Sequence, residues 1–327
     1  MDPPLEITIR PYRDADAEAI ARIHNAIFPD TPETAEEMRY EVSRFDPARY
    51  VSQWLVAETR PGTDVVGYGY YRHLPWAYHP HRYRLWVAVH PAYQRRGVGR
   101  RLIASILSAL RARGAERVTA ETREDFLSAV AGLRRFGFEE RYRDFEARLD
   151  VPGVDLSPLR SYVERAARSG VTFTTLADEV ARDASCLSGL YQAYSIMDMS
   201  APREESDPPT EPPYDEWLKQ DIQSYRTIPE AYFLAKMGDV YVGLSQLKRS
   251  RGDPTLLHQE LTAVVPPFQG RGLAVALKVL TVEYAQRHGY KTIRTFNSSR
   301  NAAMLAINRK LGFRLMPAWI GFVKTLA

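Results

Sequence analysis

Two short glycine turns carry the residue types that bind a diphosphate. They read QRRGVG over residues 94–99 and QGRGLA over residues 269–274. Each follows an apolar run and opens a helical pattern, and a helix start offers unpaired N–H groups and partial positive charge to an anion. Small residues let the anion approach the backbone, and Arg95, Arg96 and Arg271 add charge. We therefore expect a diphosphate-binding turn at both places.

Neither turn matches the other common phosphate motifs. Both lack GxGxxG, so a dinucleotide-binding fold is not the best match, and both lack GxxxxGK[ST], so a P-loop is not predicted. Small residues at a strand–helix junction can also serve packing alone, so each turn by itself leaves that alternative open.

The turns belong to an internal repeat. Gln94 and Gln269 are 175 positions apart, and the same shift relates further landmarks without an insertion. These pairs are Pro91 and Pro266, Gly97 and Gly272, Gly114 and Gly289, and Gly137 and Gly312. A matched set in one register indicates a duplication. We expect an N-terminal domain of residues 1–150 and a C-terminal domain of residues 151–327.

Both copies predict the same order of elements around the turn. A buried strand precedes it, an amphipathic helix follows and ends at a glycine, and then come a strand, a helix, Gly-Phe and a last strand. The expected strands are 6–10, 65–70, 85–89 and 117–122 in the first copy and 171–176, 240–244, 261–265 and 292–296 in the second.

This order of motifs resembles the GNAT superfamily of N-acetyltransferases over nearly the whole chain. The resemblance implies a tandem member of α/β (α+β) class, in which each copy has a mixed, mostly antiparallel central sheet flanked by helices. It also implies acetyl-coenzyme A (acetyl-CoA) as acyl donor, with its pyrophosphate on the turn. The acceptor it implies is a primary amine of a small molecule or peptide, and the motifs do not identify it further.

The resemblance assigns cofactor contacts to the strand before each turn, to the turn itself and to two downstream asparagines. In the second copy these are Thr262, Ala263, Val264, Gln269, Gly270, Arg271, Gly272, Leu273, Ala274, Asn297 and Asn301. In the first copy they are Val87, Val89, Gln94, Arg95, Arg96, Gly97, Val98 and Gly99.

Side chains near the turn suggest that only the second copy is catalytic. His258 and Glu260 alternate in a strand and so share a face, where either could act as a base or order a water that does. The equivalent residues of the first copy, Tyr83 and Leu85, are not plausible bases near neutral pH. Without a catalytic role, Glu260 would be a carboxylate at the surface end of a strand and His258 a histidine of a loop, and these alternatives stay open.

The asparagines make the same distinction between the copies. Asn297, Asn301 and Asn308 correspond to Thr122, Phe126 and Leu133 in the first copy, which lacks their polarity; helix capping would also explain Asn301. Asn308 stands where many GNAT enzymes carry a tyrosine acid. Because an amide cannot donate a full proton, the acid is expected to be water, another side chain or absent.

Composition excludes several other classes of protein. The formal charge is +4 and the chain is 45% hydrophobic, which fits a globular protein with an anionic small ligand better than a nucleic-acid binder. A single cysteine, Cys186, excludes an internal disulfide or a cysteine metal cluster, and no metal is expected. No apolar run is long enough to cross a bilayer. We expect a cytoplasmic monomer or weak homodimer; the alternative function is a non-catalytic CoA-binding sensor or scaffold.

Overall fold

The computed structural model describes residues 6–203 and 208–326, which form two compact units. Unit 1 contains the described residues up to Tyr142, the segment Arg251–Asp253 and the described residues from Trp319 onward. Unit 2 contains the described residues of Arg143–Ser250 and Pro254–Ala318. Each unit is a mixed sheet with helices on both faces, so the α/β fold class predicted from the sequence is confirmed.

In unit 1 every neighbouring pair of strands is antiparallel except β4 and β5. In sheet order the strands are β1 (Ile7–Pro11), β2 (Ser52–Thr59), β3 (Val65–Arg72), β4 (Arg82–Val89), β5 (Arg117–Arg123) and β13 (Trp319–Thr325). The helices are α1 (Ala17–Ile27) and α2 (Ala35–Ser43) on one face and α3 (Val98–Ala112) and α4 (Leu127–Arg135) on the other.

Unit 2 repeats this plan, with β10 and β11 as its parallel pair. In sheet order the strands are β7 (Val171–Thr175), β8 (Thr227–Met237), β9 (Val240–Arg249), β10 (Leu256–Val264), β11 (Thr292–Ser298) and β6 (Glu139–Asp150), and β12 (Arg314–Leu315) also pairs with β6. The helices are α5 (Arg160–Arg168), α6 (Leu176–Arg182), α7 (Cys186–Met199), α8 (Tyr214–Trp217), α9 (Leu273–Arg287) and α10 (Ala302–Leu311). The strands and turn-following helices predicted from the sequence are confirmed in both copies.

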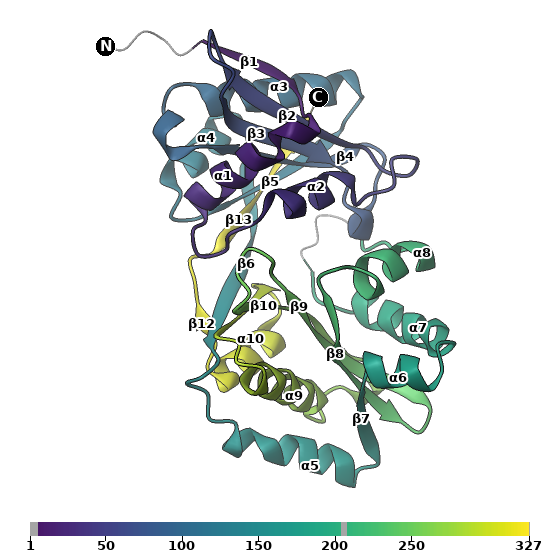
Figure 1. Ribbon diagram of the computed structural model, residues 1–327. Coiled ribbons are helices and arrows are strands. Elements are labelled where there is room, and N and C mark those ends of the chain that lie inside the picture. Colours follow the sequence, from purple (N-terminus) through teal and green to yellow (C-terminus); the bar gives the residue numbers. More distant parts are fainter. Residues whose placement is uncertain (1–5, 204–207, 327) are drawn as a thin grey trace. The chain divides into compact units, whose positions relative to one another are not determined.

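The last strand of each copy completes the sheet of the other copy. The C-terminal strand β13 pairs antiparallel with β5 of unit 1, where its yellow ribbon lies among purple and blue elements (Figure 1). The later part of β6 pairs in the same way with β11 of unit 2. The backbone hydrogen bond just after each of these strands is also equivalent in the two copies. Leu326 N–H donates to Glu116 O, and Val151 N–H donates to Lys291 O. The compact units therefore differ from a contiguous division at residue 150.

Side-chain size distinguishes the exchanged strands. Phe322 of β13 is fully buried in unit 1, and its repeat equivalent on β6, Ala147, is fully buried in unit 2. An alanine in the place of Phe322 would leave a cavity, whereas a phenylalanine in the place of Ala147 would overpack. Each strand therefore fits the sheet that it joins.

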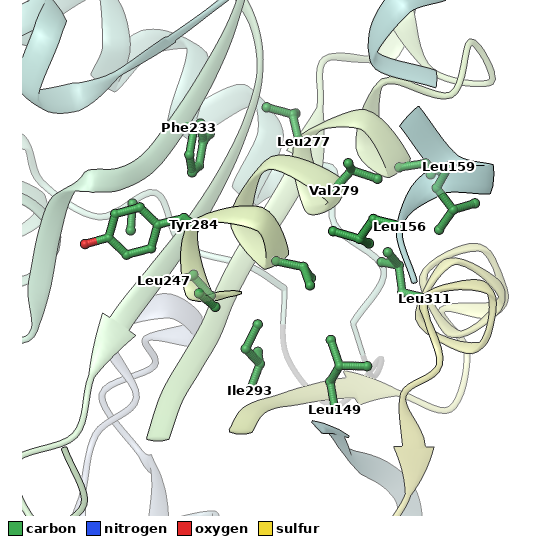
Figure 2. Packing of buried hydrophobic residues seen from close by; sticks show 14 of the residues in the cluster. Leu149, Leu156, Leu159, Phe233, Leu247, Leu277, Val279, Tyr284, Ile293 and Leu311 are labelled. Atoms are coloured by element: carbon green, nitrogen blue, oxygen red, sulfur yellow. The ribbon is translucent and has the colours of Figure 1, made fainter. Parts of the chain in front are cut away.

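The core of unit 2 lies between its sheet and helices α5, α9 and α10. Figure 2 shows part of this cluster, with Leu277 and Tyr284 from α9, Ile293 from β11, Leu149 from β6 and Leu311 from α10. All five side chains are buried. The core thus fixes α9, and with it the turn that opens α9, against the sheet.

Candidate functional site

Strand β10 separates from β11 just before the second turn. The parallel ladder runs from the pair Leu256 and Thr292 to the pair Gln259 and Thr295, and it stops there. The register of β10 with β9 also shifts between Gln259 and Thr262, which marks a bulge. The backbone after Gln259 is therefore released from β11 and is free on that side to bond a ligand.

The bulge also decides which face each candidate residue occupies. Gln259 and Thr262 lie on the α9 face, where Ser245 Oγ bonds Thr262 Oγ1 at 2.8 Å and Thr281 Oγ donates to Gln259 Oε1 at 3.1 Å. Glu260 is exposed and His258 is half-buried. Burial, with Arg294 and Arg226, lowers the pKa of His258 to about 3, so its ring is neutral at pH 7 but weakly basic. Glu260 is the stronger candidate for a base.

Both glycine turns have the same backbone geometry. Gln94 Nε2 donates to Val89 O at 3.0 Å, and Gln269 Nε2 donates to Val264 O at 2.9 Å, so each glutamine ties its turn to the preceding strand. Gly97 and Gly272, with φ of 85° and 82°, cap α3 and α9 in the left-handed conformation. Two residues earlier, Arg95 and Gly270 also have positive φ, 62° and 74°. The turns predicted from the sequence thus open helices at both places.

The surroundings of the two turns differ. Outside its own chain neighbours, no described heavy atom lies within 4 Å of the position that a Cβ would take at Gly97. At Gly272 that position lies 2.6 Å from Cδ1 of Tyr162, a residue of α5. The ring of Tyr162 is therefore packed against the second turn, whereas the first turn is open.

A pocket of about 410 Å³ lies between the second turn and α5. Its walls include Arg165 and Ser169 from the α5 side and Gly270, Arg271 and Leu273 from the turn. The cations and the backbone at this helix start suit an anionic ligand, so the residues present fit the diphosphate of a CoA ester.

Tyr162 also connects the turn to α10. Lys310 Nζ donates to Tyr162 Oη at 2.8 Å, and this bond lowers the pKa of the Tyr162 phenol. The guanidinium of Arg165 stacks on the same ring at 4.4 Å. Tyr162 is not identifiable from the sequence, because a tyrosine in an amphipathic helix carries no signal of what it contacts.

The three asparagines of the second copy have different roles. Asn301 is the N-cap of α10, where its Oδ1 accepts from Met304 N–H at 3.1 Å, so capping accounts for it. Asn308 Nδ2 donates to Asn297 Oδ1 at 2.6 Å. Asn308 Oδ1 accepts from the buried Lys278 Nζ of α9 at 2.5 Å. Lys278 does not stand out in the sequence, where it is a lysine next to the apolar stripe of α9.

Aromatic side chains occupy the equivalent region of unit 1. The β4–β5 ladder ends at the pair Leu85 and Ala120, and β4 pairs with β3 without a register shift. Trp86, the next residue, lies 6.0 Å from Trp319 and 6.3 Å from Phe28 between ring centroids. Phe28 also contacts Phe126, which takes the place of Asn301. Aromatic rings therefore line this region, which lacks the bulge and the asparagines of unit 2.

No helix in the described part of the chain has the length and apolar character that a membrane span requires. Among the described residues there is no group of three or more histidine, cysteine, aspartate or glutamate side chains that could hold a metal ion.

Comparisons with known proteins agree with the repeat. The family model of the acetyltransferase (GNAT) family matches residues 17–138 and again residues 192–313. No curated protein matches the chain.

Two solved structures resemble the whole fold. A tandem GNAT protein from the clavulanic acid biosynthesis pathway is 19% identical with a TM-score of 0.72, and the alignment covers 98% of each chain. A GCN5-related N-acetyltransferase from Sphaerobacter thermophilus is also 19% identical, with a TM-score of 0.69 and coverage of 98% of this chain and 95% of that one. At this identity the likeness concerns the fold, which here consists of two copies in tandem.

Proposed function

Because the chain belongs to the acetyltransferase (GNAT) family, we propose that it transfers the acetyl group of acetyl-CoA to a primary amine, with the chemistry in unit 2. The amine would belong to a small molecule or a peptide. The observation that carries this proposal is the released backbone of β10 after Gln259, bordered by the polar chain of Lys278, Asn308 and Asn297. The equivalent place in unit 1 holds aromatic rings.

Acetyl-CoA would supply an activated thioester and a diphosphate by which to bind it. The residues that would hold the diphosphate are the backbone amides of Gly270, Gly272 and Leu273 with the side chain of Arg271. The N–H groups of Thr262 and Val264 would bond the arm of the donor and the oxygen on which negative charge develops, since the N–H groups that alternate with them face β9. These groups suit the role because β11 no longer pairs with this part of β10.

Glu260 would provide the base, directly or through a water molecule. Removal of one proton would make the amine nucleophilic, its nitrogen would form a bond to the acetyl carbon as the carbon–sulfur bond breaks, and the nitrogen would lose a second proton to solvent to leave the neutral amide. The sulfur leaves as a thiolate and takes a proton from solvent, since Asn308 cannot supply one. His258 is a weaker candidate because its low pKa makes it a poor proton acceptor.

A pair of matched substitutions tests which turn holds the cofactor. Gly270 and Arg95 occupy the same left-handed position, which aspartate tolerates better than most residues, and a Cβ at Gly270 meets no described atom within 4 Å. We expect Gly270→Asp to weaken acetyl-CoA binding about a hundredfold by charge repulsion, whereas Arg95→Asp leaves the site in unit 2 intact. Isothermal titration calorimetry measures both.

Gly270→Asn is the control, because it has the same shape without the charge and should bind as wild type does. If Gly270→Asp binds acetyl-CoA with the wild-type affinity and stoichiometry, the proposal for unit 2 is wrong. Gly272 is a poorer choice for this test, since any side chain there would collide with Tyr162.

The open turn of unit 1 favours a second candidate function. Gly97 is unobstructed, and Arg95 and Arg96 are exposed beside it, so unit 1 could hold CoA without performing chemistry. The protein would then be a CoA-binding sensor or scaffold. Loss of binding with Arg95→Asp but not with Gly270→Asp, together with no acetyl transfer to amines, would support this candidate.

A further inference from the structure

An ionisable side chain lies at the centre of unit 2. Lys278 is 1% exposed, and its Nζ lies 2.5 Å from Asn308 Oδ1 and 4.9 Å from the ring centroid of Phe313. Lysine is almost never fully buried in proteins, because its ammonium loses the solvation of water. The fold itself does not require it, since Ile103 and Leu133 are buried at the equivalent positions of unit 1.

The lysine determines how the neighbouring amides are oriented. Lys278 Nζ donates to Asn308 Oδ1 and so holds this oxygen toward α9, and in its protonated form the lysine can only donate. The Nδ2 of Asn308 then donates to Asn297, which must present its own Oδ1. The Nδ2 group of Asn297 keeps two N–H donors that this chain of hydrogen bonds does not use. One buried lysine therefore orients two amides in turn.

Asn297 lies where the two strands separate. It follows Thr295, the last β11 residue in the ladder with β10, by two positions, and its side chain is half-buried rather than enclosed. A donor at this point suits a carbonyl oxygen, which can only accept. A freely rotating asparagine would present its own oxygen to that carbonyl part of the time.

We propose that Lys278 is a positioning residue that, through Asn308, holds Asn297 as a hydrogen-bond donor to a carbonyl oxygen of the acyl donor. The inference rests on the proposed function in unit 2. It assigns Asn308 a role other than that of an acid: Asn308 transmits the orientation imposed by Lys278.

Asn308→Asp reverses the orientation while keeping the contact with the lysine. The carboxylate still accepts from Lys278, but it can only accept from Asn297, which must then turn its Nδ2 inward and its Oδ1 toward the ligand. We expect the Kd and the KM for acetyl-CoA to rise about tenfold or more, with kcat changed much less. Calorimetry and steady-state kinetics measure these constants, and the thermal midpoint reports the fold.

A second variant covers the case in which Asn308→Asp does not fold. Lys278→Ile combined with Asn308→Leu installs the residue pair of unit 1, which packs without a buried charge. Asn297 can then rotate, so acetyl-CoA should bind several-fold more weakly than to wild type and more tightly than to a folded Asn308→Asp.

The two proposals fail in different ways. If Gly270→Asp weakens binding as expected but a folded Asn308→Asp or the double variant binds acetyl-CoA as wild type does, the function stands and the role of Lys278 is overturned. A fall in kcat with an unchanged KM would also overturn it, because orientation of a binding group acts on KM. If Gly270→Asp leaves binding unchanged, both proposals are overturned together.

Discussion

At the scale of the residue, Lys278 couples the stability of the protein to pH. Burial lowers its pKa from 10.5 to about 7. Below pH 7 the lysine is charged in both the folded and the unfolded chain, and the folded protein bears the full cost of the buried charge. Between pH 7 and 10.5 only the unfolded chain remains protonated, so this residue makes the free energy of unfolding rise with pH, by about 1.4 kcal/mol per unit.

Lys278→Met should remove this dependence. Methionine has a similar length and no charge, so we expect the variant to be more stable than wild type below pH 7 and the difference to shrink as the pH rises to 9. Urea unfolding at pH 6, 7.5 and 9 measures it, and the difference between the two proteins cancels other titrating groups. A difference that stays constant with pH would show that Lys278 keeps an ordinary pKa.

At the scale of the element, α5 places a side chain against the second turn. Helix α5 precedes β7, the first strand of the second copy, whereas no helix precedes β1 among the described residues of unit 1. It packs on α9, to which it is also linked by an ion pair between Arg160 and Glu283, and it sets the Tyr162 ring against Gly272. The ring thus occupies backbone surface that a diphosphate would approach.

Tyr162→Ala should tighten the binding of acetyl-CoA by a few-fold, because it uncovers the turn and frees Lys310 for the ligand. Tyr162→Phe is the matched control: it frees Lys310 but keeps the ring, so it should have the smaller effect. Calorimetry measures the affinity, and both variants carry Arg95→Asp so that any binding at the turn of unit 1 is removed. Weaker binding by Tyr162→Ala would instead mean that the ring is part of the binding surface.

At the scale of the whole molecule, the exchange of β6 and β13 connects the end of the chain to the stability of its beginning. Phe322 and Ile320 of β13 are buried in the core of unit 1, against β5 and α3. Removal of residues 319–327 should therefore destabilise unit 1 and leave unit 2 folded. Hydrogen exchange tests this, since amides of β5 should lose protection while those of β10 and β11 retain it.

Phe322→Ala is a milder form of the same experiment. It should lower the free energy of unfolding of unit 1 by about 3–5 kcal/mol, because β13 stays paired but the missing ring leaves a cavity in the core. If the amides of β11 lose protection in either variant while those of β5 keep it, β13 does not belong to the sheet of unit 1.

The sequence by itself determined the duplicated plan. The shift of 175 residues, the strand, turn and helix around Gln94 and Gln269, and the glycine caps all depend on local backbone preference and on hydrophobic period, which a single chain displays directly. The capping role of Asn301 was predictable for the same reason. The two matches to the family model, over residues 17–138 and 192–313, are related by the same shift.

Only the tertiary structure decided which groups meet. The two copies end in equivalent strands, so local pattern could not show that β13 joins β5; that choice depends on whether Phe322 or Ala147 fills a cavity built by distant residues. In the same way, the packing of Tyr162 on Gly272 and the bond of Lys278 to Asn308 join side chains from separate elements. Their sequence neighbours do not specify them, because contact between distant residues is set by packing and not by local backbone preference.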